Sequence, residues 1–118
     1  MTSPSILIVD DEAVVRAYIV RALRMQGFEV VEAPDGPSAW QIALERSFAL
    51  VITDNRMPGM SGKELTRRLR AHQPDTRILC VSGSQDPPDE HDDHVAHLRK
   101  PFGIGELVLK VRELIQDG

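Results

Sequence analysis

Four short apolar runs recur along the chain, separated by longer amphipathic segments. The runs are Ile6–Val9, Leu50–Ile52, Ile78–Val81 and Val95–Leu98. Continuous apolar runs of this length are typical of strands that are buried on both faces of a parallel sheet. A fifth segment, Phe28–Glu32, alternates in part, which the edge of a sheet tolerates. The pattern therefore predicts five strands.

Helix-length segments lie between most of these strands. The first has an apolar face with helical spacing and ends at Gly27; this face comprises Val15, Tyr18, Ile19, Ala22 and Leu23. Further helices are predicted from Asp35 to about Arg46, with Ala39, Trp40, Ala43 and Leu44 facing inward, from the capping box at Ser61 to about His72, and over Ile104–Ile115. Strand–helix alternation with right-handed crossovers predicts a doubly wound α/β fold, with one domain over residues 1–118.

The segment Gln85–His94 breaks this alternation. It reads QDPPDEHDDH, with two prolines, five acidic residues and neither Lys nor Arg. It has almost no apolar stripe that could hold a helix onto the sheet. We expect an acidic loop, in which the fourth helix is shortened or disordered.

Composition narrows the class of protein. The chain has 118 residues, 42% of them hydrophobic, and a formal net charge of −4. A mildly acidic domain is a poor general binder of nucleic acid or anionic membrane. No apolar run approaches the ~20 residues of a membrane span, and Met1–Ser5 does not resemble a signal peptide, so we expect a cytoplasmic protein. Cys80 is the single cysteine, so an intrachain disulfide is impossible.

Polar residues follow the predicted strands at once. Asp10, Asp11 and Glu12 follow the first strand, and Asp54 follows the strand at Leu50–Ile52 after one residue. Ser82 follows the strand at 78–81, and Lys100 comes shortly after the last one. Because the carboxyl ends of parallel strands share one edge of a sheet, we expect these side chains to converge there.

This set of side chains favours a particular chemistry. Crowded carboxylates repel one another unless a cation shares them, and oxygen ligands indicate Mg²⁺. A lysine and a hydroxyl beside Mg²⁺ suit a phosphoryl group, and an Asp carboxylate can itself accept that group. The sequence contains no GxxxxGK[ST] motif, so a P-loop nucleotide site is excluded.

Four motifs in this order resemble the receiver domain of two-component response regulators, in the CheY-like superfamily. They are Val9-Asp10-Asp11-Glu12, Thr53-Asp54 with Met57-Pro58-Gly59-Met60-Ser61-Gly62, Val81-Ser82-Gly83, and Lys100-Pro101-Phe102. The resemblance covers essentially the whole chain. It implies a flavodoxin-like, five-stranded parallel sheet of order 2-1-3-4-5, phosphorylation by a sensor histidine kinase or a phosphotransfer domain, and Mg²⁺ as cofactor.

The resemblance also implies roles for individual residues. Asp54 is expected to be the phosphoacceptor and a Mg²⁺ ligand. Asp11 would bind Mg²⁺ directly and Asp10 largely through water, with the backbone carbonyl of Arg56 as a further ligand. The Arg56 side chain would overhang the site and could alter the lifetime of the acyl phosphate.

Ser82 and Lys100 would each bind a phosphoryl oxygen, and the bond from Lys100 to Pro101 is similar to one that is often cis in the family. Ser82 and His97 would form the switch, although the family has an aromatic residue where His97 stands. The receiver would catalyse its own phosphorylation and dephosphorylation and control an output partner that the sequence does not identify. Oligomeric state is left open, because the unusual segment falls where the family often dimerises.

Simpler interpretations exist for several residues. Asp10 and Asp11 could be helix caps, and Ser82 or Lys100 could be turn residues. The spacing of His91, His94 and His97 resembles a Zn²⁺ or Ni²⁺ site, but an exposed polar loop with one strand histidine fits better. Cys80 is expected to be a buried small hydrophobic residue.

Two other functions compete with the receiver interpretation. The first is a pseudo-receiver that binds partners without being phosphorylated. The second is an aspartyl-phosphate hydrolase, although the Asp-x-Asp nucleophile motif is missing and the chain has no room for a cap domain.

Overall fold

The computed structural model of the chain describes residues 4–83 and 95–116. Strands and helices alternate along these residues, except that two strands follow each other before the last helix. The strands are β1 (Ser5–Val9), β2 (Glu29–Ala33), β3 (Leu50–Asp54), β4 (Arg77–Ser82) and β5 (Val95–Arg99). The helices are α1 (Ala13–Met25), α2 (Gly36–Glu45), α3 (Gly62–His72) and α4 (Ile104–Gln116).

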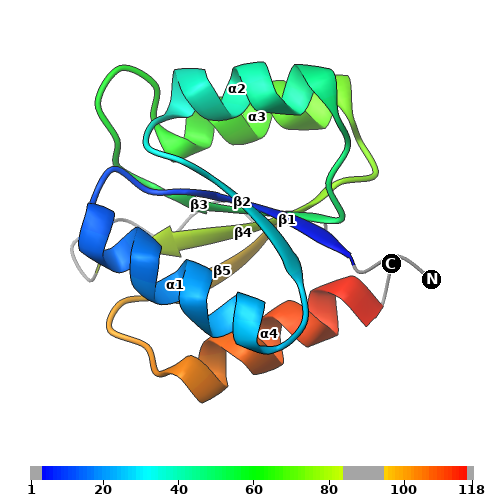
Figure 1. The fold of residues 1–118 in the computed structure, drawn as a ribbon. Helices are drawn as coiled ribbons and strands as arrows, with labels where there is room; N and C mark the ends of the chain where they lie inside the picture. Colours follow the sequence, from blue (N-terminus) through cyan, green and yellow to red (C-terminus); the bar gives the residue numbers. More distant parts are fainter. Residues whose placement is uncertain (1–3, 84–94, 117–118) are drawn as a thin grey trace.

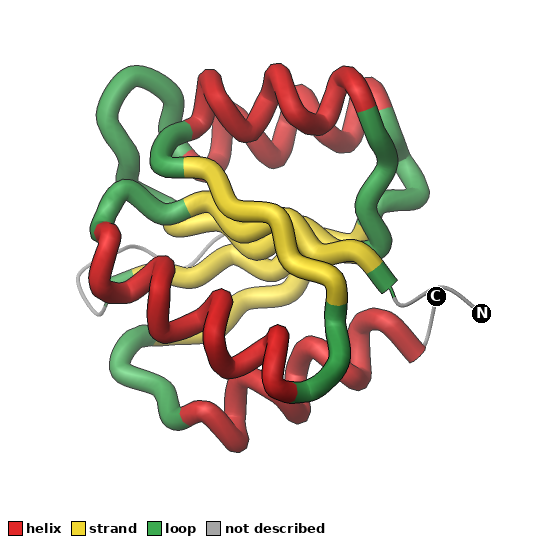
Figure 2. The backbone as a smooth tube through the Cα atoms, viewed as in Figure 1, coloured by secondary structure: helices red, strands yellow, loops and turns green. Residues whose placement is uncertain are grey.

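The five strands form one parallel sheet of order β2-β1-β3-β4-β5. Both the number of strands and their order agree with the sequence-based prediction. All four strand pairs are parallel, so the carboxyl ends of the strands lie along one edge of the sheet. Figure 2 shows the sheet (yellow) between two layers of helices (red). Because β1 lies between β2 and β3 in this order, the first strand of the chain is internal and β1 and β3 are direct neighbours.

The helices cover both faces of the sheet, with α2 and α3 on one face and α1 and α4 on the other (Figure 1). Alternate residues of a strand point to opposite faces. Ile6 and Ile8 of β1 accordingly pack in the core under α1 and α4, whereas Leu7 and Val9 pack in the core under α2 and α3. Burial on both faces explains why this strand is continuously apolar.

Local signals begin and end the helices as the sequence predicts. The Asp35 carboxylate accepts a hydrogen bond from the Ser38 amide (2.8 Å) at the start of α2. The Ser61 hydroxyl accepts one from the Glu64 amide (3.1 Å) at the start of α3. Gly27, with a φ of 92°, lies just beyond α1, in a conformation that favours glycine.

Two inward-facing predictions are wrong. Tyr18 of α1 is 43% exposed, and Val20, which is outside the predicted face, is 4% exposed. Contacts of α1 with β2 as well as β1 rotate its buried face toward Val20. Leu44 of α2 is 44% exposed, because α2 packs through the small residues Ala39 and Ala43.

Some predictions fall on residues 84–94, which lie outside the described residues. They include the acidic loop, the shortened or disordered fourth helix, and the positions of His91 and His94. Among the helices in the described ranges, none combines the length and apolar character needed to cross a membrane.

Candidate functional site

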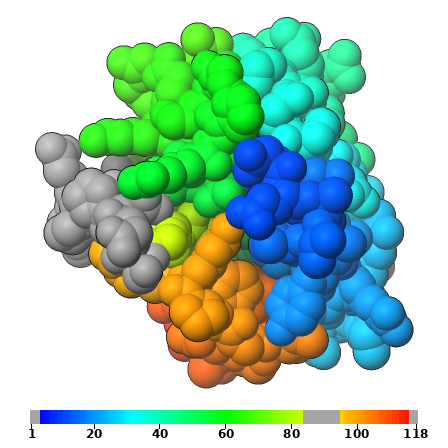
Figure 3. Space-filling model, turned by 90° about the vertical axis from the view of Figure 1, so that its left-hand side faces the viewer, coloured from blue at the N-terminus to red at the C-terminus, as the bar shows by residue number. Residues whose placement is uncertain are grey.

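Four carboxylates gather at the carboxyl edge of the sheet. Asp10, Asp11 and Glu12 directly follow β1, and Asp54 is the last residue of the neighbouring β3. One oxygen of each carboxylate lies within 4.8 Å of the others. Asp10 and Asp54 are buried, whereas Asp11 and Glu12 are exposed, so the cluster opens to solvent on one side. Figure 3 shows this face, where the early (blue), middle (green) and late (orange) parts of the chain meet.

Lys100 brings a positive charge to these acids. Its main-chain amide donates to the Ser82 carbonyl (2.8 Å) just after β5, and its bond to Pro101 is cis, as expected. Its ammonium lies 3.7 Å from an Asp54 oxygen and 3.9 Å from a Glu12 oxygen. Both separations exceed those of a direct hydrogen bond. The ammonium therefore forms long ion pairs with both carboxylates and a direct hydrogen bond with neither.

Ser82 ends β4 at the same edge of the sheet. Its neighbour Val81 is the register partner of Asp54, and the Asn55 amide donates to the Val81 carbonyl (2.9 Å). Ser82 is 6% exposed. The fold thus brings together the predicted acids and Lys100, with Ser82 on the adjoining strand.

Burial makes the charged form of the two inner acids less favourable. Desolvation raises the pKa of the Asp54 carboxyl, and Lys100 and the main-chain amides of Arg56 and Asn55 oppose that rise. Desolvation also raises the pKa of Asp10, although a hydrogen bond from the Glu12 amide opposes it. The negative charges of Asp54 and Glu12 add to the rise in the pKa of Asp10, and that of Asp11 adds to the rise in the pKa of Asp54. An additional cation would offset this repulsion.

The donor set fits Mg²⁺. All four side chains offer hard oxygen atoms, which Mg²⁺ prefers to nitrogen or sulfur. The alternative in which Asp11 caps α1 is wrong, because Glu12 occupies the N-cap position and its side chain makes no capping hydrogen bond. Asp11 is therefore not used as a cap and lies exposed beside the buried pair.

Comparison with known proteins shows the family of the chain. A family model described as the response regulator receiver domain matches residues 6–112. The chain belongs to this family. Receiver domains are signalling domains of two-component systems, and their response regulators partner with histidine kinases.

Relatives of the receiver family include proteins of different length. The transcriptional regulatory protein PrrA of Mycobacterium bovis is 36% identical over 98% of the chain, which spans only 52% of PrrA. The response regulator receiver protein CpdR of Brucella abortus is 32% identical, with 93% of the chain and 95% of CpdR covered. The chain thus spans about half of one curated relative and nearly all of another.

Solved receiver structures have the same fold. A response regulator receiver domain protein from Clostridium thermocellum superimposes with a TM-score of 0.89 at 27% identity, covering 97% of this chain and 95% of that one. The receiver domain of the hybrid histidine kinase CckA gives a TM-score of 0.84 at 33% identity, covering 95% and 99%.

The remaining predicted residues lie around the acids and along β5. Arg56 is exposed in the segment between β3 and α3, two residues after Asp54. His97 is exposed in the middle of β5, where its register partner is Cys80 of β4. Cys80 is buried, as predicted. The switch role of Ser82 and His97 stays a prediction.

Two features of the site have no role in the sequence-based interpretation. Glu12 is one of the acids that follow β1, but its approach to Lys100 depends on how β5 ends. Gly62, the first residue of α3, lies so close to β3 that an added Cβ would be 2.1 Å from the Asp54 carbonyl oxygen. A glycine at the first position of a helix, where better helix formers are available, is the signal that could have indicated this contact.

Proposed function

We propose that the chain accepts a phosphoryl group on Asp54 from a phosphohistidine of a sensor histidine kinase or phosphotransfer domain. The observation that carries this proposal is the position of Asp54, which is buried within a group of four carboxylates and 3.7 Å from the Lys100 ammonium. A structural aspartate would gain little from such crowding. A phosphoacceptor needs it, because the same acids can hold a divalent cation beside the reacting oxygen.

In the proposed reaction, an Asp54 carboxylate oxygen attacks the phosphorus of the phosphohistidine. A phosphorus–oxygen bond forms and the phosphorus–nitrogen bond breaks. The imidazole nitrogen keeps the bonding electron pair and takes a proton from solvent. The product is an acyl phosphate on Asp54, which water hydrolyses to restore the carboxylate.

The neighbouring residues position and neutralise the group. Asp10, Asp11, Asp54 and the backbone carbonyl of Arg56 would hold Mg²⁺, which supplies positive charge to the phosphoryl oxygens. The Lys100 ammonium is close enough to pair with another phosphoryl oxygen after a small movement.

The Ser82 hydroxyl would donate a hydrogen bond to a further oxygen. Movement of Ser82 toward the phosphoryl group, with a response at His97, would shift the population between two states of this face. That shift would control an output protein or domain. A cytoplasmic location is part of the proposal, since sensor kinases use ATP there.

A protein donor must also dock beside the site. Val14 and Tyr18 lie on α1 just after the acids, and Val14 is 83% exposed. Tyr18 is 43% exposed and, four residues after Val14, is its neighbour on the surface of the helix. Exposed apolar side chains that lie together mark contact surfaces. We include this part of α1 in the surface that receives the donor.

Incubation with phosphoramidate and Mg²⁺, followed by intact-mass measurement, tests the proposal. We expect one added phosphoryl group that is stable in acid and labile in base, and none in Asp54→Asn. Asp75→Asn is the matched control, because Asp75 is an exposed aspartate between α3 and β4, and it should be phosphorylated normally. Phosphorylation of Asp54→Asn would contradict the assignment. Absence of Mg²⁺ binding and of phosphorylation would favour a pseudo-receiver, and steady turnover of a phosphomonoester would favour a hydrolase.

A further inference from the structure

Arg16 of α1 links the acid-bearing loop to the edge strand β2. Its Nη1 donates to the main-chain carbonyl of Asp10 (2.7 Å), and its Nε donates to the Glu32 carboxylate (2.9 Å). The Arg16 side chain is 18% exposed, and Asp10 is 2% exposed. One planar guanidinium therefore joins the end of β1 to the end of β2.

The carbonyl that Arg16 binds belongs to the most buried acid of the site. The Asp10 amide donates to Ala33 (3.3 Å) on β2, and the Asp10 carboxylate accepts from the Glu12 amide (2.8 Å). Together with the bond from Arg16, these contacts restrain the amide, carbonyl and side chain of Asp10. The direction in which the Asp10 and Asp11 carboxylates point depends on this short loop.

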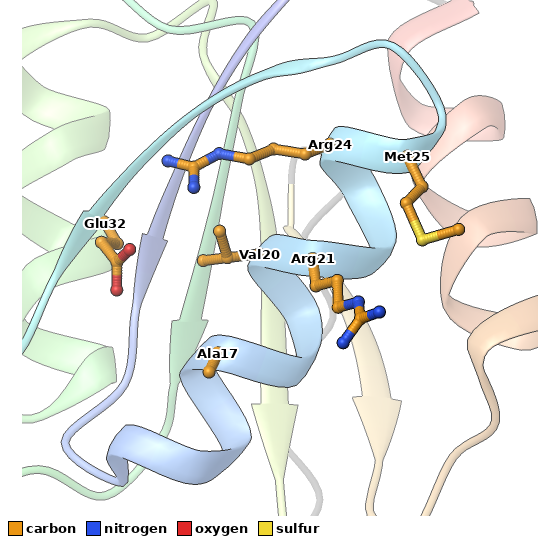
Figure 4. A pocket seen from close by; sticks show the side chains of 6 residues that line it. All are labelled: Ala17, Val20, Arg21, Arg24, Met25 and Glu32. Carbon is orange, nitrogen blue, oxygen red and sulfur yellow. The ribbon is translucent and has the colours of Figure 1, made fainter.

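Glu32 is the more exposed partner of the ion pair with Arg16. It lines a shallow hollow of about 530 Å³ between α1 and β2, with Val20 and Arg24 among its other lining residues (Figure 4). Arg24 reaches across toward β2 and donates to the Val30 carbonyl (3.2 Å). Glu32 is 42% exposed, and an ion pair this open to water contributes little to stability. The pair of bonds from Arg16 therefore contributes more to the orientation of the Asp10 loop than to the free energy of folding.

We propose that Arg16 is a positioning residue for the metal-binding carboxylates, with Glu32 as its anchor. Arg16 binds the main chain of Asp10 and not its carboxylate, so it orients the ligand without competing with a cation for the ligand's oxygens. The planar fork of arginine makes both bonds at once, whereas the single ammonium of lysine does not reproduce this geometry. The proposal rests on the proposed function only in naming the cation.

Mg²⁺ affinity, measured by calorimetric titration of the whole chain, tests this role. We expect Arg16→Met and Arg16→Lys to weaken Mg²⁺ binding by about 10-fold, which is typical of lost outer-shell partners. Glu32→Gln keeps an oxygen acceptor for Nε and should bind Mg²⁺ almost as well as the wild type. Glu32→Ala removes that acceptor and should behave like Arg16→Met.

The matched control is Arg46→Met. Arg46 pairs with Glu29 at the other end of β2, with the same 2.9 Å separation. Glu29 is the register partner of Ser5, at the end of β1 that lies away from the acids. It should leave Mg²⁺ affinity unchanged. Equal Mg²⁺ affinity in Arg16→Met and the wild type, or equal loss in Arg16→Met and Arg46→Met, would overturn the proposal.

A second measurement separates this proposal from the proposed function. In the metal-free protein, the NMR resonance of the Glu12 amide reports its hydrogen bond to the Asp10 carboxylate. We expect this resonance to shift in Arg16→Met and not in Arg46→Met. If the wild type binds no Mg²⁺, the proposed function fails, and the Glu12 resonance alone decides the role of Arg16. An unchanged resonance would overturn that role.

Discussion

Replacing Gly62 with alanine should directly disturb β3, the strand that carries Asp54. An added Cβ would lie 2.1 Å from the Asp54 carbonyl oxygen and 2.9 Å from the Asn55 Cα. Carbon and oxygen atoms approach to about 3.3 Å at the closest. Both neighbouring atoms belong to the backbone, so no flexible side chain can yield. The start of α3 and the end of β3 must therefore separate by about 1 Å.

That separation has a calculable cost. The Gly62 amide donates to the Asn55 carbonyl at 3.0 Å, and a further 1 Å breaks this bond. Overpacking costs about 1–3 kcal/mol and the lost bond about 1 kcal/mol. The higher helix propensity of alanine returns about 1 kcal/mol. We expect a net loss of about 1–3 kcal/mol, which lowers the melting temperature by about 4–12 °C.

Thermal unfolding of Gly62→Ala, with Gly105→Ala as the matched control, measures this loss of stability. Gly105 lies in the first turn of α4 and has no atom within 4 Å of an added Cβ, so its replacement should be neutral or stabilising by up to about 1 kcal/mol. Gly62→Ala should also slow phosphorylation by phosphoramidate by about 100-fold, because a displacement near 1 Å has this cost at a reacting group. Unchanged melting and phosphorylation of Gly62→Ala would refute the reasoning.

Three further predictions concern charge and donor choice. Asp54→Asn should raise the melting temperature of the metal-free protein at pH 7 by roughly 2–5 °C, because burial raises the pKa of Asp54 and makes its ionised form costly. Because the pKa of Asp54 is higher in the folded state, the wild type loses stability as pH rises from the unfolded pKa, about 3.9, toward the folded pKa. The gain from Asp54→Asn should therefore shrink as pH falls toward the unfolded pKa. A gain that grows in acid would contradict the assignment. Mg²⁺ should stabilise the wild type more than Asp54→Asn, and equal thermal shifts would remove Asp54 from the ligand set. Val14→Glu should slow phosphorylation by a histidine-phosphorylated protein and not by phosphoramidate, whereas Leu44→Glu on the distant α2 should slow neither.

The sequence predicts most of the architecture because the strands are buried on both faces. Runs such as Ile6–Val9 are continuous enough to be found without a structure, and parallel strands place their carboxyl ends on one edge. The meeting of Asp10, Asp54 and Lys100 follows from that geometry. The capping signals at Asp35 and Ser61 are equally local and equally readable.

Features that depend on how elements pack against one another are harder to predict. The rotation of α1 that buries Val20 and exposes Tyr18 arises from its contact with β2, which a helical period does not contain. The approach of Gly62 to Asp54 depends on where α3 starts against the sheet. The two hydrogen bonds of Arg16, to the Asp10 carbonyl and to Glu32, require the ends of β1 and β2 to lie side by side, as their register places them.

Stability and function oppose each other at the carboxyl edge. The burial that raises the pKa of Asp10 and Asp54 also leaves their oxygen atoms, which would bind a cation and position a phosphoryl group, less well solvated than those of exposed acids. Neutral side chains there would stabilise the metal-free fold and remove the ligands. Lys100 resolves only part of this conflict, because its ammonium is 3.7 Å from Asp54 and 3.9 Å from Glu12 and makes a close contact with neither. An ammonium held at these distances can move toward a new anion without any change in the backbone, which would suit the proposed phosphorylation, because that reaction adds negative charge beside Asp54.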